Sequence, residues 1–387
     1  MKITVIITVL LSAVSLAFAQ DCFSSRQQRY TYEQGLASTV ENYRITSCLK
    51  KELAKKDYQS FSQAVSSLRK SNNLKGVIHL LIDVFVNSKD PQTVFTAATA
   101  LISAPEESIA FQKDFINELT SPVAPDYKKT LAAVVLIAAE EANGSYTAFL
   151  EPALNAKDKA LEAYACGAYS LLVPGTSEKY LNPIIRLYAF DKTFAQKAFA
   201  STGLSQSVLN ARLVEDYYSQ EQALRLAAIE WIGDSGNKKL LVKLLSPQVS
   251  KTKEGPTLSA AANALLRNYA AISVDLRKAL KKDPASESAT VAVMTYSFMG
   301  SRSYEVITPL LSKGSDNEIS NALRIITSIT GILDEDPSYY PNPGLEKQRL
   351  TKLIAPVAQA GKNAQSAEVK LYAQSAAKEL YRFLNGR

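Results

Sequence analysis

Residues 221–245 read EQALRLAAIEWIGDSGNKKLLVKLL and contain one complete unit of a pattern that recurs along the chain. Leu224–Ile232 has apolar residues three and four positions apart, the spacing of one face of an α-helix. Gly233–Asn237 then supplies the small and polar residues of a connection. Leu240–Leu245 has two apolar pairs separated by two residues, which form a broad stripe on a second helix. The segment therefore predicts two helices joined by a short turn.

Helical patterns of the same kind recur, and alternating strand patterns with Asn-Gly or Asp-Gly turns are absent. The clearest further helices are expected at Thr130–Glu141, Leu258–Leu266 and Ile319–Ile329. The sequence therefore predicts an all-α fold.

The frame of two apolar pairs returns at regular distances. Four copies have a proline at the fourth position, namely Pro152, Pro183, Pro309 and Pro356. The fourth positions Val84, Glu118, Pro152 and Pro183 follow one another at steps of 34, 34 and 31 residues, a period typical of stacked helical units. We expect the four prolines at equivalent places in the first helix of each unit, where each kinks its helix.

Two features resemble the HEAT repeat: the proline of the first helix, and residues 225–233, RLAAIEWIG, followed by Asp234 and Asn237. The resemblance covers roughly residues 76 to 384 and is strongest in 221–245. It implies a right-handed α-solenoid of stacked antiparallel helix pairs that binds other macromolecules, and it does not imply a reaction. The residue spacing predicts about nine such pairs after the cap. The Asp and the basic residue of the family's second helix are mostly absent, so an armadillo-like arrangement stays an alternative.

The chain divides into three expected parts. Residues 1–19 have a positive start, an apolar stretch and Ala17-Phe18-Ala19, the layout of a secretory signal cleaved after Ala19. Residues 20–75 fall outside the repeat and predict a helical cap, with helices at 32–56 and 58–70. Residues 76–387 hold the repeats, and the 47-residue step from Pro309 to Pro356 indicates an inserted loop at 334–347.

Three cysteines remain after the predicted cleavage. Cys22 and Cys48 flank the first mature segment and could form a disulfide in an oxidising compartment. Cys166 lies in a run of small residues and is expected to be a reduced, buried thiol.

Catalytic patterns are scarce. His79 is the single histidine and is expected to pack or cap, since zinc sites and catalytic triads need partners that the sequence does not supply. Phosphate-binding glycine loops are absent, and no cofactor is expected. The carboxylate pairs Glu106-Glu107 and Glu140-Glu141 indicate solvated helix edges. Residues 334–336 indicate an acidic turn, because they lack the ligand spacing of a calcium loop.

Two features favour binding. Tyr339 and Tyr340 lie together in the predicted loop, where they contact a partner or a second copy of the chain, or else pack onto neighbouring helices. Basic residues cluster at Lys238, Lys239 and Lys243, at 251–253 and at 277–282. These clusters form either a solvated face or a basic stripe. Such a stripe would bind an acidic protein, a lipid head group or a polyanionic glycan.

We therefore expect a non-catalytic exported scaffold or adaptor that binds a protein partner in the cell envelope, or assembles with itself. The periplasm is the expected compartment, with an extracellular location as the alternative. The formal charge of +7 is spread among both signs, which gives no case for nucleic acid, and no transmembrane segment is expected after cleavage. The alternative function is a hydrolase of an envelope polymer with a carboxylate site on the concave face.

Overall fold

The structure, a computed structural model, describes Lys51 and residues 58–70, 74–140, 143–175, 178–245 and 255–385. All regular structure in these ranges is helical, which confirms the predicted all-α class. The predicted signal peptide, Cys22, Cys48 and most of the predicted cap lie outside the described residues. Among the helices that the structure describes, none is long and apolar enough to span a bilayer. The chain forms two compact units, residues 1–203 and 204–387.

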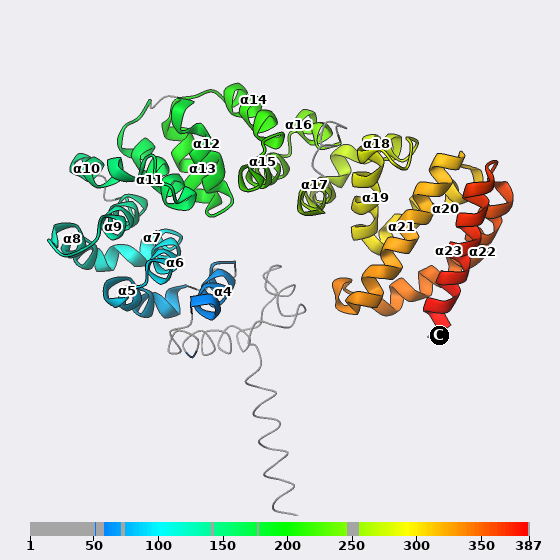
Figure 1. Cartoon of the computed structure of the whole chain (residues 1–387), viewed down its shortest axis with the longest axis horizontal. Helices are drawn as coiled ribbons and strands as arrows, with labels where there is room; N and C mark the ends of the chain where they lie inside the picture. The colour runs from blue at the N-terminus through cyan, green and yellow to red at the C-terminus, as the bar shows by residue number, and fades with distance from the viewer. Residues whose placement is uncertain are drawn as a thin grey trace, which may run out of the picture. The chain divides into compact units, whose positions relative to one another are not determined.

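The N-terminal unit arranges its helices in two rows (Figure 1). One row is formed by α4, α6, α9, α11 and α13, each packed against the next, and the helices between them pack against this row. The bounds are α4 Tyr58–Lys70, α5 Ile78–Asn87, α6 Pro91–Ile102, α7 Pro105–Ser108, α8 Gln112–Thr120, α9 Asp126–Ala138, α10 Thr147–Leu150, α11 Lys159–Leu172, α12 Leu181–Tyr188 and α13 Lys192–Ser201.

The C-terminal unit repeats this arrangement. The helices α15, α17, α19, α21 and α23 pack in succession, and α14, α16, α18, α20 and α22 cover them from the other row. The bounds are α14 Gln206–Tyr217, α15 Gln222–Ser235, α16 Lys238–Lys243, α17 Gly255–Arg267, α18 Tyr269–Ala279, α19 Glu287–Met299, α20 Tyr304–Lys313, α21 Asp316–Glu335, α22 Pro343–Asn363 and α23 Ala367–Asn385.

Small residues allow neighbouring helices to approach closely, both within one row and between the two rows. A Cβ atom added to Gly233 of α15 would lie 2.8 Å from the Cβ of Ala264 in α17. A Cβ on Gly167 of α11 would lie 2.6 Å from a methyl carbon of Leu187 in α12. Real Cβ atoms do not come this near, so a larger residue at Gly233 would push α15 and α17 apart, whereas at Gly167 the Leu187 side chain would have to move.

Side-chain caps set many of the helix starts. Asp90, Asp158, Asp191, Ser205, Asn237, Ser286, Ser315 and Asn342 each accept a hydrogen bond from a backbone N–H of the first turn that follows. Ser315 and Glu318 form a reciprocal capping box at the start of α21. Gly236, with φ of 61°, ends α15 in the left-handed conformation that glycine adopts readily.

The four repeat prolines all lie in helical turns. Pro183 is near the start of α12, Pro309 is inside α20 and Pro356 is in the second half of α22, whereas Pro152 lies in a 3₁₀ turn that follows α10. The sequence predicts equivalent positions for the four prolines, but their distances from the helix starts differ. The reason is local, because each helix starts at its own cap and α22 begins well before its proline.

The expected irregular loop at 334–347 is mostly helical, which corrects the sequence prediction. Helix α21 continues to Glu335, the 3₁₀ helix η8 covers Pro337–Tyr339, and α22 begins at Pro343. The Asn342 side chain accepts a hydrogen bond from the backbone N–H of Leu345, with Pro343 at the first helical position. The inserted residues thus lengthen two helices and leave only 336–342 to connect them.

Candidate interaction surface and polar clusters

Helices α16 and α18 pack side by side and bring two lysine clusters of the sequence together. Lys238, Lys239 and Lys243 are exposed on α16. Their neighbours on and just after α18 are also exposed, namely Arg277, Lys278, Lys281 and Lys282. These seven side chains are called the basic face below.

Two exposed valines lie among these cations. Val274 of α18 is 58% exposed and Val242 of α16 is partly exposed. Helical spacing places Val274 on the same side as Arg277 and Lys278, three and four residues later. The basic face therefore offers apolar contact area as well as positive charge.

Acidic neighbours offset the charge of this face only weakly. The Nζ atom of Lys238 lies 3.7 Å from Oδ2 of Asp275, and Nζ of Lys281 lies 4.0 Å from Oε1 of Glu318. Both lysine side chains are largely exposed, and exposed ion pairs at these distances contribute little. The face stays positive overall and can attract an acidic surface.

The two predicted binding tyrosines have different surroundings. Tyr340 is 4% exposed, and its hydroxyl donates a hydrogen bond to the Ser297 carbonyl oxygen at 2.7 Å. Its ring reaches Gly300, whose added Cβ would lie 2.7 Å from Cε1 of that ring. Tyr339 is 37% exposed and packs against Phe298 with ring centroids 6.0 Å apart. Tyr340 therefore packs onto the neighbouring helices, and Tyr339 alone keeps an accessible ring.

Glu346 is a buried carboxyl that the sequence pattern does not reveal. It lies in the first turn of α22, and its Oε2 atom has no hydrogen-bond partner among the described residues. Burial raises the pKa of Glu346, although hydrogen bonds with Ser301 act in the opposite direction. A Cβ on Gly300 would lie 2.9 Å from Oε2. The carboxyl therefore helps to fill the space beside Tyr340. An acidic residue in a first helical turn is usually solvated, so the sequence carries no signal of this burial.

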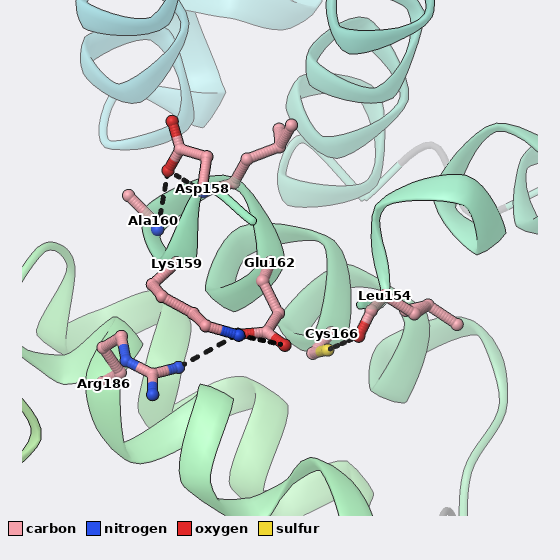
Figure 2. A network of polar contacts seen from close by, with 8 residues as sticks. Leu154, Asp158, Lys159, Ala160, Glu162, Cys166 and Arg186 are labelled. Atoms are coloured by element: carbon pink, nitrogen blue, oxygen red, sulfur yellow. Dashed lines mark hydrogen bonds and ion pairs between the residues drawn. The ribbon is translucent and has the colours of Figure 1, made fainter. Parts of the chain in front are cut away.

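A partly buried ion-pair network lies in the N-terminal unit, in which Glu162 and Arg186 are buried and Lys159 is 54% exposed. Figure 2 shows Lys159 and Arg186 both reaching the Glu162 carboxylate, with nitrogen-to-oxygen distances of 3.0 and 3.2 Å. One turn further along α11, the thiol of Cys166 points to the carbonyl oxygen of Leu154 at 3.7 Å. The network joins α11 to α12, and Cys166 is reduced and buried as predicted.

We predict that Cys166 reacts very slowly with thiol reagents in the folded protein. Burial, assisted by the charge of Glu162, raises the pKa of the thiol to about 12, so almost no thiolate exists near neutral pH. Because the folded pKa is raised, this thiol's contribution to stability is complete below its ordinary pKa of about 8.5 and falls as the pH rises towards 12. Peptide mass spectrometry after iodoacetamide treatment at pH 8 should show Cys166 labelled only after denaturation. Equal labelling of native and denatured protein would contradict the prediction.

The residues considered for catalysis have local structural contacts. His79 is exposed, and its ring lies edge-on to Phe111 with centroids 4.8 Å apart. Glu140 pairs with Lys197, and Asp336 accepts hydrogen bonds from Ser338 at the start of η8. Glu106 and Glu107 lie in the first turn of α7. Across the described ranges, no three His, Cys, Asp or Glu side chains are grouped so that they could hold a metal ion.

Comparison with known proteins finds neither a matching family model nor a matching curated protein.

Proposed function

We propose that this protein is a non-catalytic scaffold that binds a protein partner through a surface of stacked helix pairs. The two rows of alternating helices in each unit support a HEAT-like, right-handed α-solenoid of about nine helix pairs. The period of the apolar frame and the residues 225–233 support the same family. The signal-like start supports export, with the periplasm as the proposed compartment.

The basic face is the single observation that carries the binding proposal. The inner helices of the stacked row, such as α15, α17, α19 and α21, bury residues on both flanks, so they have little surface to offer. Helices α16 and α18, in contrast, present seven cationic side chains and two valines to solvent. Charge complementarity favours an acidic partner, and the valines favour a protein, which can cover apolar area as it pairs with the lysines.

Charge reversal on the basic face should weaken partner binding by at least about tenfold, because four attractive contacts become repulsive. The variant combines Lys239→Glu, Lys243→Glu, Lys278→Glu and Lys281→Glu. The measurement is quantitative mass spectrometry of proteins retained from an envelope fraction by the full mature chain. Because the four substituted side chains are exposed, the variant should have the same helical circular dichroism spectrum as the unmodified chain.

A matched control reverses four exposed lysines of the N-terminal unit, Lys75, Lys89, Lys113 and Lys157. It changes the net charge by the same amount and should retain the partner. Equal retention by both variants, or equal loss, would show that the basic face is not the binding surface.

A further inference from the structure

The N-terminal unit contains a cavity of about 250 Å³ that is separate from the basic face. It lies where α4, the ends of α6 and α9, and the start of α13 meet. Ile102, Ala138 and Phe194 form its apolar wall, and Arg69, Asp191 and Lys197 supply charges. A water molecule occupies about 30 Å³ in the liquid, so the space suits a small organic molecule.

The Asp191 carboxylate is already held by the protein. It is 8% exposed, its Oδ1 accepts the backbone N–H of Phe194 at 2.9 Å, and its Oδ2 accepts the Ser103 hydroxyl at 2.7 Å. The guanidinium of Arg69 lies 3.5 Å from the same Oδ2. A cationic ligand group would have to compete with these contacts, so Asp191 is a poor anchor for an ammonium.

The two cations of the cavity can still receive a ligand, because a guanidinium has five N–H donors and the contacts of Arg69 with Asp191 and Phe190 both use Nη2. Arg69 is fixed by a hydrogen bond from Nη2 to the Phe190 carbonyl oxygen at 2.6 Å. Lys197 is 48% exposed, and its pair with Glu140 at 3.4 Å involves a carboxylate that is largely in solvent. Such an exposed pair contributes little, so a ligand carboxylate can replace it at low cost.

The charge balance and the walls define the class of ligand. Among the residues that line the cavity, Arg69 and Lys197 face one carboxylate, Asp191, and Glu140, which pairs with Lys197, is 84% exposed so that solvent screens its charge. This local balance suits a monoanion, whereas a dianion would be repelled by Asp191. The ring of Phe194 is buried and lies nearly parallel to that of Tyr164, with centroids 6.2 Å apart, so the apolar wall is firmly packed. We propose that this cavity binds a small organic monocarboxylate, with the carboxylate at Arg69 and Lys197 and the apolar part against Phe194.

The probe for this proposal is 4-fluorobenzoate, titrated into the full mature chain and followed by ¹⁹F NMR. We expect saturable binding with a Kd of about 1 mM or tighter, the range of a small ligand with one ionic anchor. The neutral analogue 4-fluorobenzamide has the same shape and should bind at least about tenfold more weakly. Equal binding of the two probes, or no saturable binding, would overturn the proposal.

Two variants locate the site. Lys197→Gln removes an exposed charge and should weaken 4-fluorobenzoate binding about tenfold, whereas the control Lys157→Gln should leave it unchanged. Ala138→Leu fills the cavity without changing any charge and should abolish binding. Binding that is unaffected by Lys197→Gln would overturn the proposal even if the Ala138 variant failed to fold. None of these results depends on partner binding at the basic face.

Discussion

Replacing Tyr340 by alanine should lower the free energy of unfolding of the C-terminal unit by about 3–5 kcal/mol, the cost of deleting a buried aromatic side chain. The ring fills the space above Gly300 and beside Tyr339, and the hydroxyl satisfies part of the Ser297 carbonyl. Neighbouring helices cannot close this gap easily, because Gly300 adopts φ of 54° and fixes the turn after α19. Urea unfolding of the full chain, followed by the fluorescence of Trp231, measures the loss.

Two further variants separate packing from binding. Tyr340→Phe keeps the ring and should cost only about 1 kcal/mol, the value of one hydrogen bond. Tyr339→Ala removes a partly exposed ring and should cost about 1 kcal/mol or less. If Tyr339→Ala destabilised the chain as much as Tyr340→Ala, the assignment of Tyr340 as the packed residue of the pair would be wrong. A loss of partner retention confined to Tyr339→Ala would instead place that ring in the interface.

Arg225→Ala should destabilise the same unit by about 3 kcal/mol, because it leaves buried acceptors without their donor and creates a cavity. Arg225 is only 1% exposed. Its Nη1 atom donates to the Ser219 carbonyl oxygen and its Nε atom to the Thr257 hydroxyl at 3.1 Å, so the side chain ties α15 to the turn before it and to α17.

The matched control is Arg267→Ala, which removes an arginine at the surface between the same two helices. Arg267 pairs with Glu230 and Asp234 at 3.2 Å each, and its side chain is 44% exposed. Such pairs contribute at most about 1 kcal/mol, so the control should shift the urea midpoint only slightly. Equal shifts for the two variants would contradict the structural role given to Arg225.

Helix positions could be predicted because they depend on the local spacing of apolar residues, which the sequence gives directly. Leu224–Ile232, for example, falls within α15, and Tyr58–Lys70 matches α4. The connection before α22 shows a missed signal, since Asn342-Pro343 is a cap followed by proline at the first helical position. Asn342 and Pro343 are also common in loops, so the sequence predicts an irregular loop that is longer than the connection in the structure.

The burial of individual polar residues could not be predicted, because it depends on contacts between distant segments. Arg225 lies on a helix with other charged residues, and nothing nearby in sequence marks Thr257 as its partner. Tyr339 and Tyr340 are adjacent, so only the backbone geometry of the turn decides which ring is buried. The cavity combines residues from position 69 to position 197, and no sequence motif links them.

The alternating rows also have a consequence for how the chain reaches its native state. Each helix packs mainly against helices one or two places away along the chain, so few contacts require the closure of long loops. Such topologies have low contact order, which goes with rapid folding, and a nucleus can form at any pair and grow outwards. Helix pairs near the start of the described chain can therefore become ordered during synthesis, before the last pairs have been made.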